Sequence, residues 1–194
     1  MATYLRKNKD SAKKFAEVLE KGGIVLHPTD TVYGLAAHGW KRKALEKLAL
    51  LKGRSWEKPF LVLSSEAMLE ELVSEIPESL RNLWEDFISK PITAILPARR
   101  DFPYITSRGK IAVRIPSDQF LLEVLQLLRA PIASTSANPA GLILPQEESI
   151  NYFSERVDLV ILGKTGGGLP STIIDFTIKP PKLIREGAYK FSME

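Results

Sequence analysis

Apolar positions recur with two different spacings along this chain of 194 residues. Spacings of three and four residues predict helices over residues 11–21, 41–51, 66–73, 78–88, 118–128 and 146–153, with Ser11 as the cap of the first helix. Short apolar runs predict strands over residues 24–26, 60–63, 92–96, 111–115, 131–134, 159–162, 172–176 and 182–185. Because strands and helices alternate, we expect an α/β protein built around a mixed sheet. No internal repeat or long linker divides the chain, which favours a single domain over residues 1–194.

The stretch from Gly23 to Leu35 combines a predicted strand with a polar loop. The apolar run Ile24–Leu26 predicts the strand, and Pro28 ends it because proline has no backbone N–H to donate. Thr29-Asp30-Thr31 follows, and such short polar side chains hold a loop in one shape by bonding nearby backbone groups. Gly34 is expected at a turn or at a close approach of another group. Ligands of α/β proteins often bind at such a loop, but a turn with local caps accounts for the same residues.

Composition narrows the possible chemistry. The chain has no cysteine, which excludes disulfides, thiolate metal sites and cysteine nucleophiles. Its two histidines, His27 and His38, cannot build a metal centre of several imidazoles and argue against a Ser-His-Asp triad. A formal charge of +4 permits an anionic ligand or nucleic acid without requiring either. We find no signal-peptide core at the N-terminus and no membrane span, so a soluble, cytoplasmic protein is expected.

Three cations, Lys52, Arg54 and Lys58, fall within seven residues after the second predicted helix. Gly53 between the first two allows a tight backbone. A triphosphate needs several fixed cations because its charge is dense and strongly hydrated. Cations at a helix C-terminus also complement the helix dipole, so a purely structural role is the alternative.

Polar side chains also follow or interrupt other predicted strands. The segment Ser134–Asn138 carries hydroxyls and an amide that suit phosphate or ribose oxygens, although they could equally cap the next segment. Arg114 lies inside an apolar strand, where a charge needs a partner. Its planar fork suits a carboxylate, supplied either by the protein or by a ligand.

Further candidates lie toward the C-terminus. Ser171 follows a glycine run at residues 166–168 that does not match a dinucleotide-binding fingerprint, and Arg185 lies close to the chain end. The only acids inside the candidate sites are Asp30 and Asp175, and we expect both to be structural caps. The sequence shows no pair of catalytic carboxylates.

Taken together, these segments resemble the YrdC/TsaC family, the threonylcarbamoyl-adenylate synthases. The matching segments, in family order, are residues 28–35, 52–54 with 58–59, 111–116, 131–138 with Gly141, 171–175, and Arg185 with Gly187. The resemblance implies a YrdC-like twisted mixed β-sheet with surrounding helices and a large, positively lined cavity. It also implies a nucleotidyltransferase that makes threonylcarbamoyl-AMP and pyrophosphate from L-threonine, bicarbonate (or CO2) and ATP. The product would serve the t6A37 modification of tRNA.

The same resemblance implies roles for individual residues. Those expected to bind L-threonine are Thr31, Tyr33, Arg114, Ser134 and Ser171. Those expected to bind ATP are Lys52, Arg54, Lys58, Ser136, Asn138 and Arg185, with Lys52 and Arg54 as the catalytic residues. Mg2+ is expected to arrive on the phosphates of ATP rather than in a protein cage. No protein base is evident, so positioning and charge neutralisation would supply most of the catalysis. The expected downstream partners are the proteins that transfer the threonylcarbamoyl group to tRNA.

Two other functions stay open at this point. One is a non-catalytic module of the same fold that binds double-stranded RNA or tRNA, although the sequence lacks a basic stripe interleaved with aromatic residues. The other is carbamoyl-adenylate transfer, as in the related domain of hydrogenase-maturation proteins. The chain also departs from the family pattern: Ser89-Lys90-Pro91 stands where Pro-Gly-Pro is usual, and Ser117 stands where histidine is common. These departures leave room for a divergent paralogue.

Overall fold

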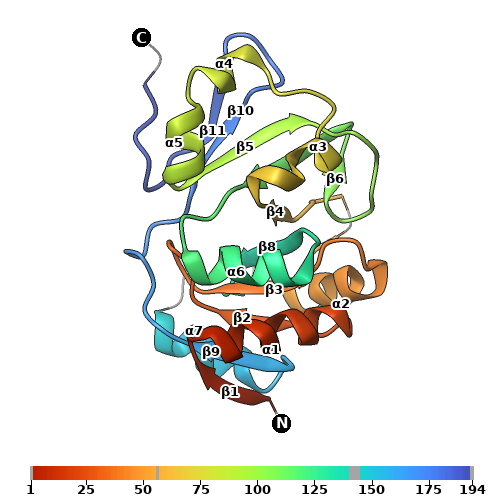
Figure 1. Cartoon of the computed structure of the whole chain (residues 1–194), viewed down its shortest axis with the longest axis vertical. Helices are drawn as coiled ribbons and strands as arrows, with labels where there is room; N and C mark the ends of the chain where they lie inside the picture. The colour runs from red at the N-terminus through yellow and green to blue at the C-terminus, as the bar shows by residue number, and fades with distance from the viewer. Residues whose placement is uncertain (1, 56, 140–144, 193–194) are drawn as a thin grey trace.

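The computed structural model describes residues 2–55, 57–139 and 145–192, which form one twisted sheet with helices around it (Figure 1). The 11-stranded sheet has the order β1-β9-β2-β3-β8-β4-β7-β5-β10-β11, with β6 paired to β7 outside this path. The strands are β1 (Thr3–Arg6), β2 (Val25–His27), β3 (Gly34–His38), β4 (Leu61–Leu63), β5 (Ile92–Pro97), β6 (Thr106–Ser107), β7 (Lys110–Arg114), β8 (Ile132–Ser136), β9 (Leu159–Leu162), β10 (Thr172–Asp175) and β11 (Lys182–Arg185). Parallel pairs such as β4–β7 and β5–β10 alternate with antiparallel ones, so the sheet is mixed as expected.

Helices cover both faces of the sheet (Figure 1). They are α1 (Lys9–Glu20), α2 (Arg42–Lys52), the 3-10 turn η1 (Glu66–Met68), α3 (Leu69–Leu72), α4 (Glu78–Arg81), α5 (Trp84–Ser89), α6 (Gln119–Leu128) and α7 (Gln146–Ser154). Along β9 and residues 24–26, successive apolar side chains point to alternate faces of the sheet and enter the two different hydrophobic cores on those faces. Val25 joins the core under α1 and α6, whereas Leu26 joins the core that also contains Leu45 and Leu48 of α2. Burial on both faces explains why these strands read as unbroken apolar runs.

Several local expectations were wrong. The first helix begins at Lys9, because Asn8 is its N-cap: Asn8 Oδ1 accepts the Ser11 N–H at 2.8 Å, and Ser11 Oγ accepts the Asn8 N–H at 2.9 Å. The sequence did not predict β3, β1 or β6. Gly34 begins β3 instead of a turn, and a Cβ there would lie 3.4 Å from Ser134 Oγ and the Thr135 carbonyl oxygen. The predicted helices over residues 66–73 and 78–88 each divide in two, as η1 with α3 and as α4 with α5.

The sheet brings the polar segments together. The loop between β2 and β3 carries Thr29–Thr31, and Gly34 at the start of β3 pairs with Ser136 at the end of β8. Arg114 ends β7 and pairs with Leu63 of β4. Polar strand ends that lie far apart in the sequence therefore meet around one region of the sheet.

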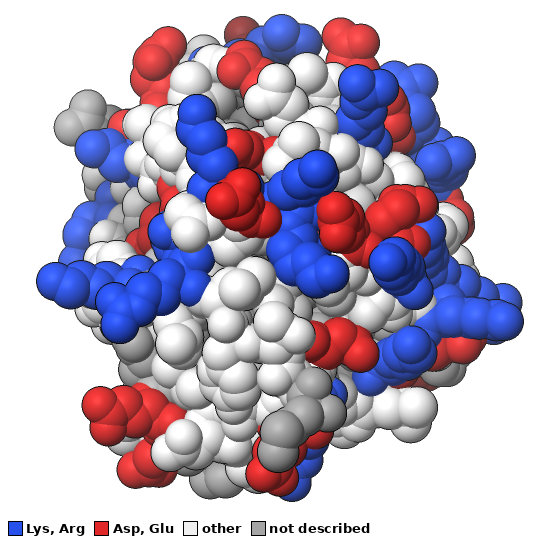
Figure 2. Space-filling model, turned by 60° about the horizontal axis from the view of Figure 1, so that its bottom comes forward, with Lys and Arg blue, Asp and Glu red and all other residues white. Residues whose placement is uncertain are grey.

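On the outer surface, positively and negatively charged side chains lie side by side. On the face shown in Figure 2, lysine and arginine side chains are interspersed with aspartate and glutamate around an uncharged area. No continuous basic stripe crosses the described residues on this face.

Candidate functional site

Two adjoining cavities lie where the polar strand ends meet. The first, cavity 1, has a volume of about 230 Å³. The second, cavity 2, has a volume of about 730 Å³. They share a wall formed by Val32, Tyr33, Ser136, Pro170 and Arg185. The two cavities therefore adjoin along these five residues.

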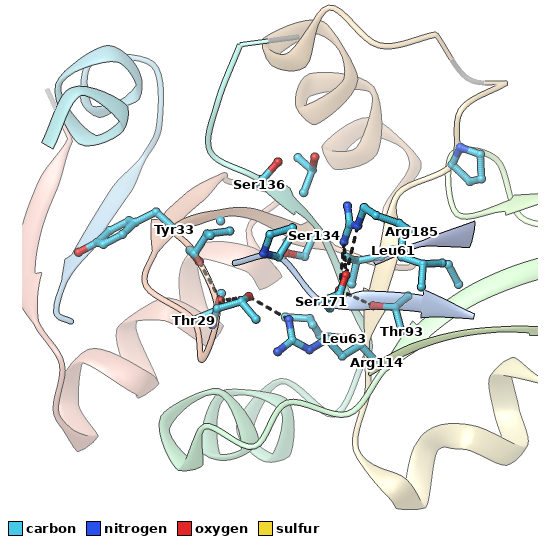
Figure 3. A pocket seen from close by; sticks show the side chains of 18 of the residues that line it. Thr29, Tyr33, Leu61, Leu63, Thr93, Arg114, Ser134, Ser136, Ser171 and Arg185 are labelled. Carbon is cyan, nitrogen blue, oxygen red and sulfur yellow. Dashed lines mark hydrogen bonds between the residues drawn. The ribbon is translucent and has the colours of Figure 1, made fainter. Parts of the chain in front are cut away.

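Cavity 1 is lined by hydroxyl groups, arginines and a few apolar side chains (Figure 3). Its polar lining includes Thr29, Thr31, Arg54, Thr93, Arg114, Ser134, Thr135, Ser136, Ser171 and Arg185, and its apolar lining includes Leu61, Leu63 and Ile173. Cavity 2 adds Asn138, Ser149, Thr165, Gly168 and Leu169. Among the described lining residues, the only charged side chains are Arg54, Arg114 and Arg185, so both cavities present positive charge.

Arg114 is almost fully buried, with 3% of its surface exposed. Its Nη1 donates to Thr31 Oγ1 at 3.0 Å, and its Nη2 lies 2.7 Å from Asp30 Oδ1. Burial lowers the pKa of Arg114, and the Asp30 carboxylate opposes that shift. A buried arginine with a carboxylate partner confirms the expectation for this position, and the partner is a side chain of the protein.

Asp30 is also a cap, as the sequence predicted. Its Oδ2 accepts hydrogen bonds from Ser117 Oγ at 2.8 Å and from the Ser117 N–H at 3.2 Å. The same carboxylate therefore joins the polar loop after β2 to the residues that follow β7.

Thr29 and Thr31 form a directed chain of hydrogen bonds. The Thr29 hydroxyl donates to the Val32 carbonyl oxygen at 2.8 Å, and Thr29 Oγ1 lies 2.8 Å from Thr31 Oγ1. Because the single proton of Thr29 is used, the Thr31 hydroxyl must donate to Thr29. Thr31 then offers only acceptor lone pairs, one of which receives the Arg114 N–H.

Tyr33 lines both cavities, but its side chain extends away from the other labelled residues of cavity 1 (Figure 3). The hydroxyl oxygen accepts the Gly163 N–H at 3.0 Å and faces the carbonyl oxygens of Gly163 and Ile161 at 3.0 and 3.3 Å. Burial raises the pKa of the Tyr33 hydroxyl. The hydroxyl of Tyr33 thus binds the main chain at the end of β9 and just beyond it.

The three clustered cations take three different positions. Lys52, the last residue of α2, is 7% exposed, and its Nζ donates to the main-chain carbonyls of Ser136, at 2.9 Å, and Asn138. Burial, with a smaller contribution from the charge of Arg54, lowers the pKa of Lys52 to about 8. Arg54 lines cavity 1, while Lys58 is exposed and lines neither cavity. Direct contact of Lys52 and Lys58 with ATP stays a prediction.

Arg185 and Ser171, which both line cavity 1, are joined by hydrogen bonds (Figure 3). Its Nε and Nη2 donate to the Ser171 carbonyl at 3.1 and 2.7 Å, and Nη2 also donates to Ser171 Oγ at 3.2 Å. Ser171 Oγ lies 2.8 Å from the hydroxyl of Thr93, which is fully buried. Burial and the nearby charge of Arg114 lower the pKa of Arg185.

The segment 163–170, which we call the strap, lies against the loop after β2. Gly166 N–H donates to the Thr29 carbonyl at 3.2 Å, and Gly168 N–H donates to the Thr31 carbonyl at 3.2 Å. A Cβ at Gly166 would lie only 2.1 Å from the Asp30 carbonyl oxygen, so this close approach requires glycine. The glycine run therefore forms the strap, which also lines cavity 2 through Thr165, Gly168, Leu169 and Pro170.

Sequence reasoning missed Thr29 and Thr93 as lining residues and Asp30 as the partner of Arg114. A signal existed for Asp30, because a buried arginine needs a carboxylate and only Asp30 and Asp175 were near the candidate sites. Nothing in the sequence distinguished Thr93 from other strand threonines. The expected Gly141 lies outside the described residues.

Comparison with known proteins identifies the fold family. A family model described as "Telomere recombination", which covers Sua5, YciO and YrdC, matches residues 17–187. The chain belongs to the Sua5/YciO/YrdC family. The crystal structure of Pyrococcus abyssi Sua5 complexed with L-threonine superimposes with a TM-score of 0.88 at 31% identity, covering 96% of this chain and 57% of that one. The YrdC-like fold expected from the sequence is therefore confirmed.

The curated relatives include proteins named threonylcarbamoyl-AMP synthase. The Pyrococcus abyssi threonylcarbamoyl-AMP synthase is 34% identical over 180 residues, which are 89% of this chain and 52% of the relative. A Methanocaldococcus jannaschii relative is 32% identical over 187 residues, which are 93% of this chain and 89% of the relative. The chain thus spans about half the length of the first relative. Within the part that the structure describes, no helix has both the length and the apolar character needed to cross a membrane.

Proposed function

We propose that this chain is a threonylcarbamoyl-AMP synthase, which joins L-threonine, CO2 or bicarbonate, and the adenylate of ATP. The observation that carries the proposal is the pair of cavities with a shared wall. Cavity 1 has the volume for a small amino acid and holds a buried arginine, while cavity 2 has room for a nucleoside. The relatives named above support the same activity.

In this proposal L-threonine binds in cavity 1, with Arg114 and Thr31 near its carboxylate and Ser134 and Ser171 beside it. The adenosine of ATP binds in cavity 2 near Asn138. The phosphates then lie along the shared wall, where Ser136 and Arg185 are placed to meet them. Arg54 faces the same ligands from the far side of cavity 1.

The reaction has two bond-forming steps. The amine nitrogen of threonine attacks the carbon of CO2, a C–N bond forms, and one amine proton leaves, giving a carbamate. A carbamate oxygen then attacks the α-phosphorus of ATP, the bond from the α-phosphorus to the bridging oxygen breaks, and pyrophosphate leaves with the electron pair. Because the described lining residues include no carboxylate or histidine, we propose that the proton passes to water.

The protein contributes position and charge in this mechanism. Holding the two ligands against a shared wall replaces a rare encounter of free molecules by a reaction between neighbours. Arg54 and Arg185 would stabilise the charge that develops on the leaving pyrophosphate. Lys52 supports the reaction indirectly, because it holds the carbonyls of Ser136 and Asn138 between the two cavities.

We propose that Mg2+ enters with ATP and compensates charge on its phosphates. Among the described residues, no group of three or more His, Cys, Asp or Glu side chains could hold a metal ion. The product would pass to proteins that transfer the threonylcarbamoyl group to tRNA, in the cytoplasm.

One assay tests the proposal. The protein is incubated with ATP, bicarbonate and Mg2+, with and without L-threonine, and pyrophosphate and threonylcarbamoyl-AMP are measured. We expect threonine-dependent release of both products. If no pyrophosphate is released but the protein binds RNA in a salt-sensitive manner, the proposed activity is wrong and an RNA-binding module replaces it.

A matched pair of variants locates the activity in cavity 1. Arg54→Ala removes a lining cation, and we expect kcat/KM to fall by about tenfold to a hundredfold. Arg99→Ala removes an exposed arginine outside both cavities and should leave the rate within about twofold of the wild type. Equal rates for the two variants would contradict the role of Arg54.

A further inference from the structure

Arg114 meets cavity 1 with only part of its guanidinium group. Two of its three nitrogens, Nε and Nη2, are sealed from solvent and complete no hydrogen bond with the described residues. These two nitrogens form one edge of the planar group, and Asp30 Oδ1 lies 2.7 Å from Nη2 on that edge. The remaining nitrogen, Nη1, donates to Thr31 Oγ1, and both residues line cavity 1.

Asp30 is itself held from two directions. Ser117 donates two hydrogen bonds to Oδ2, from its hydroxyl and its backbone N–H. The strap also packs against the main chain of Asp30. Gly166 lies so close to the Asp30 carbonyl that residue 166 has no space for a side chain. These contacts oppose rotation of the Asp30 carboxylate away from Arg114 when a second carboxylate enters the cavity.

We propose that Asp30 is a positioning residue, which holds Nη2 of Arg114 and thereby aims Nη1 at the carboxylate of the ligand in cavity 1. The ligand carboxylate binds to Nη1 beside Thr31 and does not replace Asp30 on the guanidinium edge. Ser117, at the position where the sequence departs from its family, supports Asp30. The inference deepens the proposed function, since it takes L-threonine as the ligand of cavity 1.

Asp30→Asn tests this role because asparagine keeps the size of the side chain and removes its charge. We expect the KM for L-threonine to rise about tenfold, as loss of a buried charged partner would give, with the KM for ATP changed by less than about twofold. L-Threoninol, which lacks the carboxylate, serves as a second probe in competition with L-threonine. Its inhibition constant should be nearly the same for Asp30→Asn and the wild type, because it makes no contact that Asp30 controls.

Two further variants separate positioning from folding. Ser117→Ala removes one hydrogen bond to Asp30 at an exposed residue and should raise the threonine KM about threefold, in the same direction as Asp30→Asn. Asp175→Asn is the matched control. Asp175 also pairs with a cation, Lys110 at 2.9 Å, and also accepts a backbone N–H, from Thr177, but it lines neither cavity. It should change neither KM.

The outcomes distinguish this inference from the proposed function. An unchanged threonine KM in Asp30→Asn, or equal increases in the KM of threonine and of ATP, overturns the positioning role and leaves the synthase activity standing. A lower threonine KM also overturns it, because Asp30 would then compete with the ligand for Arg114. A wild-type protein that neither binds threonine in calorimetry nor releases pyrophosphate overturns the proposed function and this inference together.

Discussion

Lys52 binds the protein's own backbone. Its ammonium group donates to carbonyls on both sides of Ala137, so it fixes the short segment that ends β8 and enters cavity 2. The charge is buried, and burial lowers the pKa of Lys52 to about 8. A lysine that titrates near this pH responds to a nearby anion, because negative charge favours its protonated form.

The lowered pKa of Lys52 predicts that the protein takes up protons when ATP binds. At pH 8 about half of the Lys52 side chains are protonated in the free protein, and the phosphates of ATP should raise the pKa. ATP binding should therefore take up as much as about half a proton at pH 8 and almost none at pH 6.5. Calorimetry in buffers of different ionisation enthalpy measures this uptake.

The Lys52→Met variant is the control for that measurement. It keeps a long side chain in the same place and should lose the proton uptake. Wild-type binding at pH 8 without proton uptake would show that ATP does not act on Lys52.

At the scale of elements, the strap joins the two cavities. It is fastened to the loop after β2 by the main-chain bonds of Gly166 and Gly168, and to Tyr33 by both main-chain groups of Gly163. The strap also lines cavity 2. The loop after β2, which lines cavity 1, is therefore bonded to a segment that lines cavity 2.

Tyr33→Phe tests this connection, because it removes only the hydroxyl that holds Gly163. We expect the KM for ATP to rise about threefold to tenfold with a smaller change for threonine, since the loss of one buried hydrogen bond releases an end of the strap. Steady-state kinetics with each substrate varied in turn give the two values.

Tyr152→Phe is the matched control for the loss of a hydroxyl. Tyr152 is 42% exposed and lines neither cavity, so both KM values should stay those of the wild type. A rise confined to the threonine KM in Tyr33→Phe would mean that the hydroxyl serves cavity 1 instead.

At the scale of the whole molecule, His27 ties stability to pH. It is fully buried in β2 with its ring 5.0 Å from that of Phe15, and burial lowers its pKa to about 4. Above pH 6.5 the side chain is neutral in both the folded and the unfolded protein. Between pH 6.5 and pH 4 only the unfolded protein takes up the proton, so the free energy of unfolding falls as the pH falls.

Urea unfolding at pH 7 and pH 4.5 measures this effect. The His27 contribution should lower the free energy of unfolding by about 2 kcal/mol between these two values. His27→Gln should show a fall that is smaller by this amount, even if the variant is less stable at both values. Equal falls for the two proteins would place the acid sensitivity in other groups.

Elements were predicted well where one spacing of apolar residues continues without interruption over the whole element. The helices at 41–51 and 118–128 and the strand at 159–162 were found within about one residue of their ends. The strand Gly34–His38 was missed because its Gly-Leu-Ala-Ala-His sequence lacks the β-branched residues that mark a strand. Its pairing with β2 and β8 supplies the stability that its own residues do not.

For the site, the sequence by itself determined which residue types lie at the strand ends, because those types follow directly from the order of polar and apolar positions. The tertiary structure alone decided where each charge points. Lys52 and Arg54 are separated by a single glycine, yet Gly53 takes a left-handed conformation that ends α2, so one side chain enters the protein and the other lines cavity 1. Arg114 likewise needed a partner in any fold, but only the sheet brings Asp30, 84 positions earlier in the chain, within 2.7 Å of it. Long-range pairing of this kind depends on packing of the whole chain, which no local pattern records.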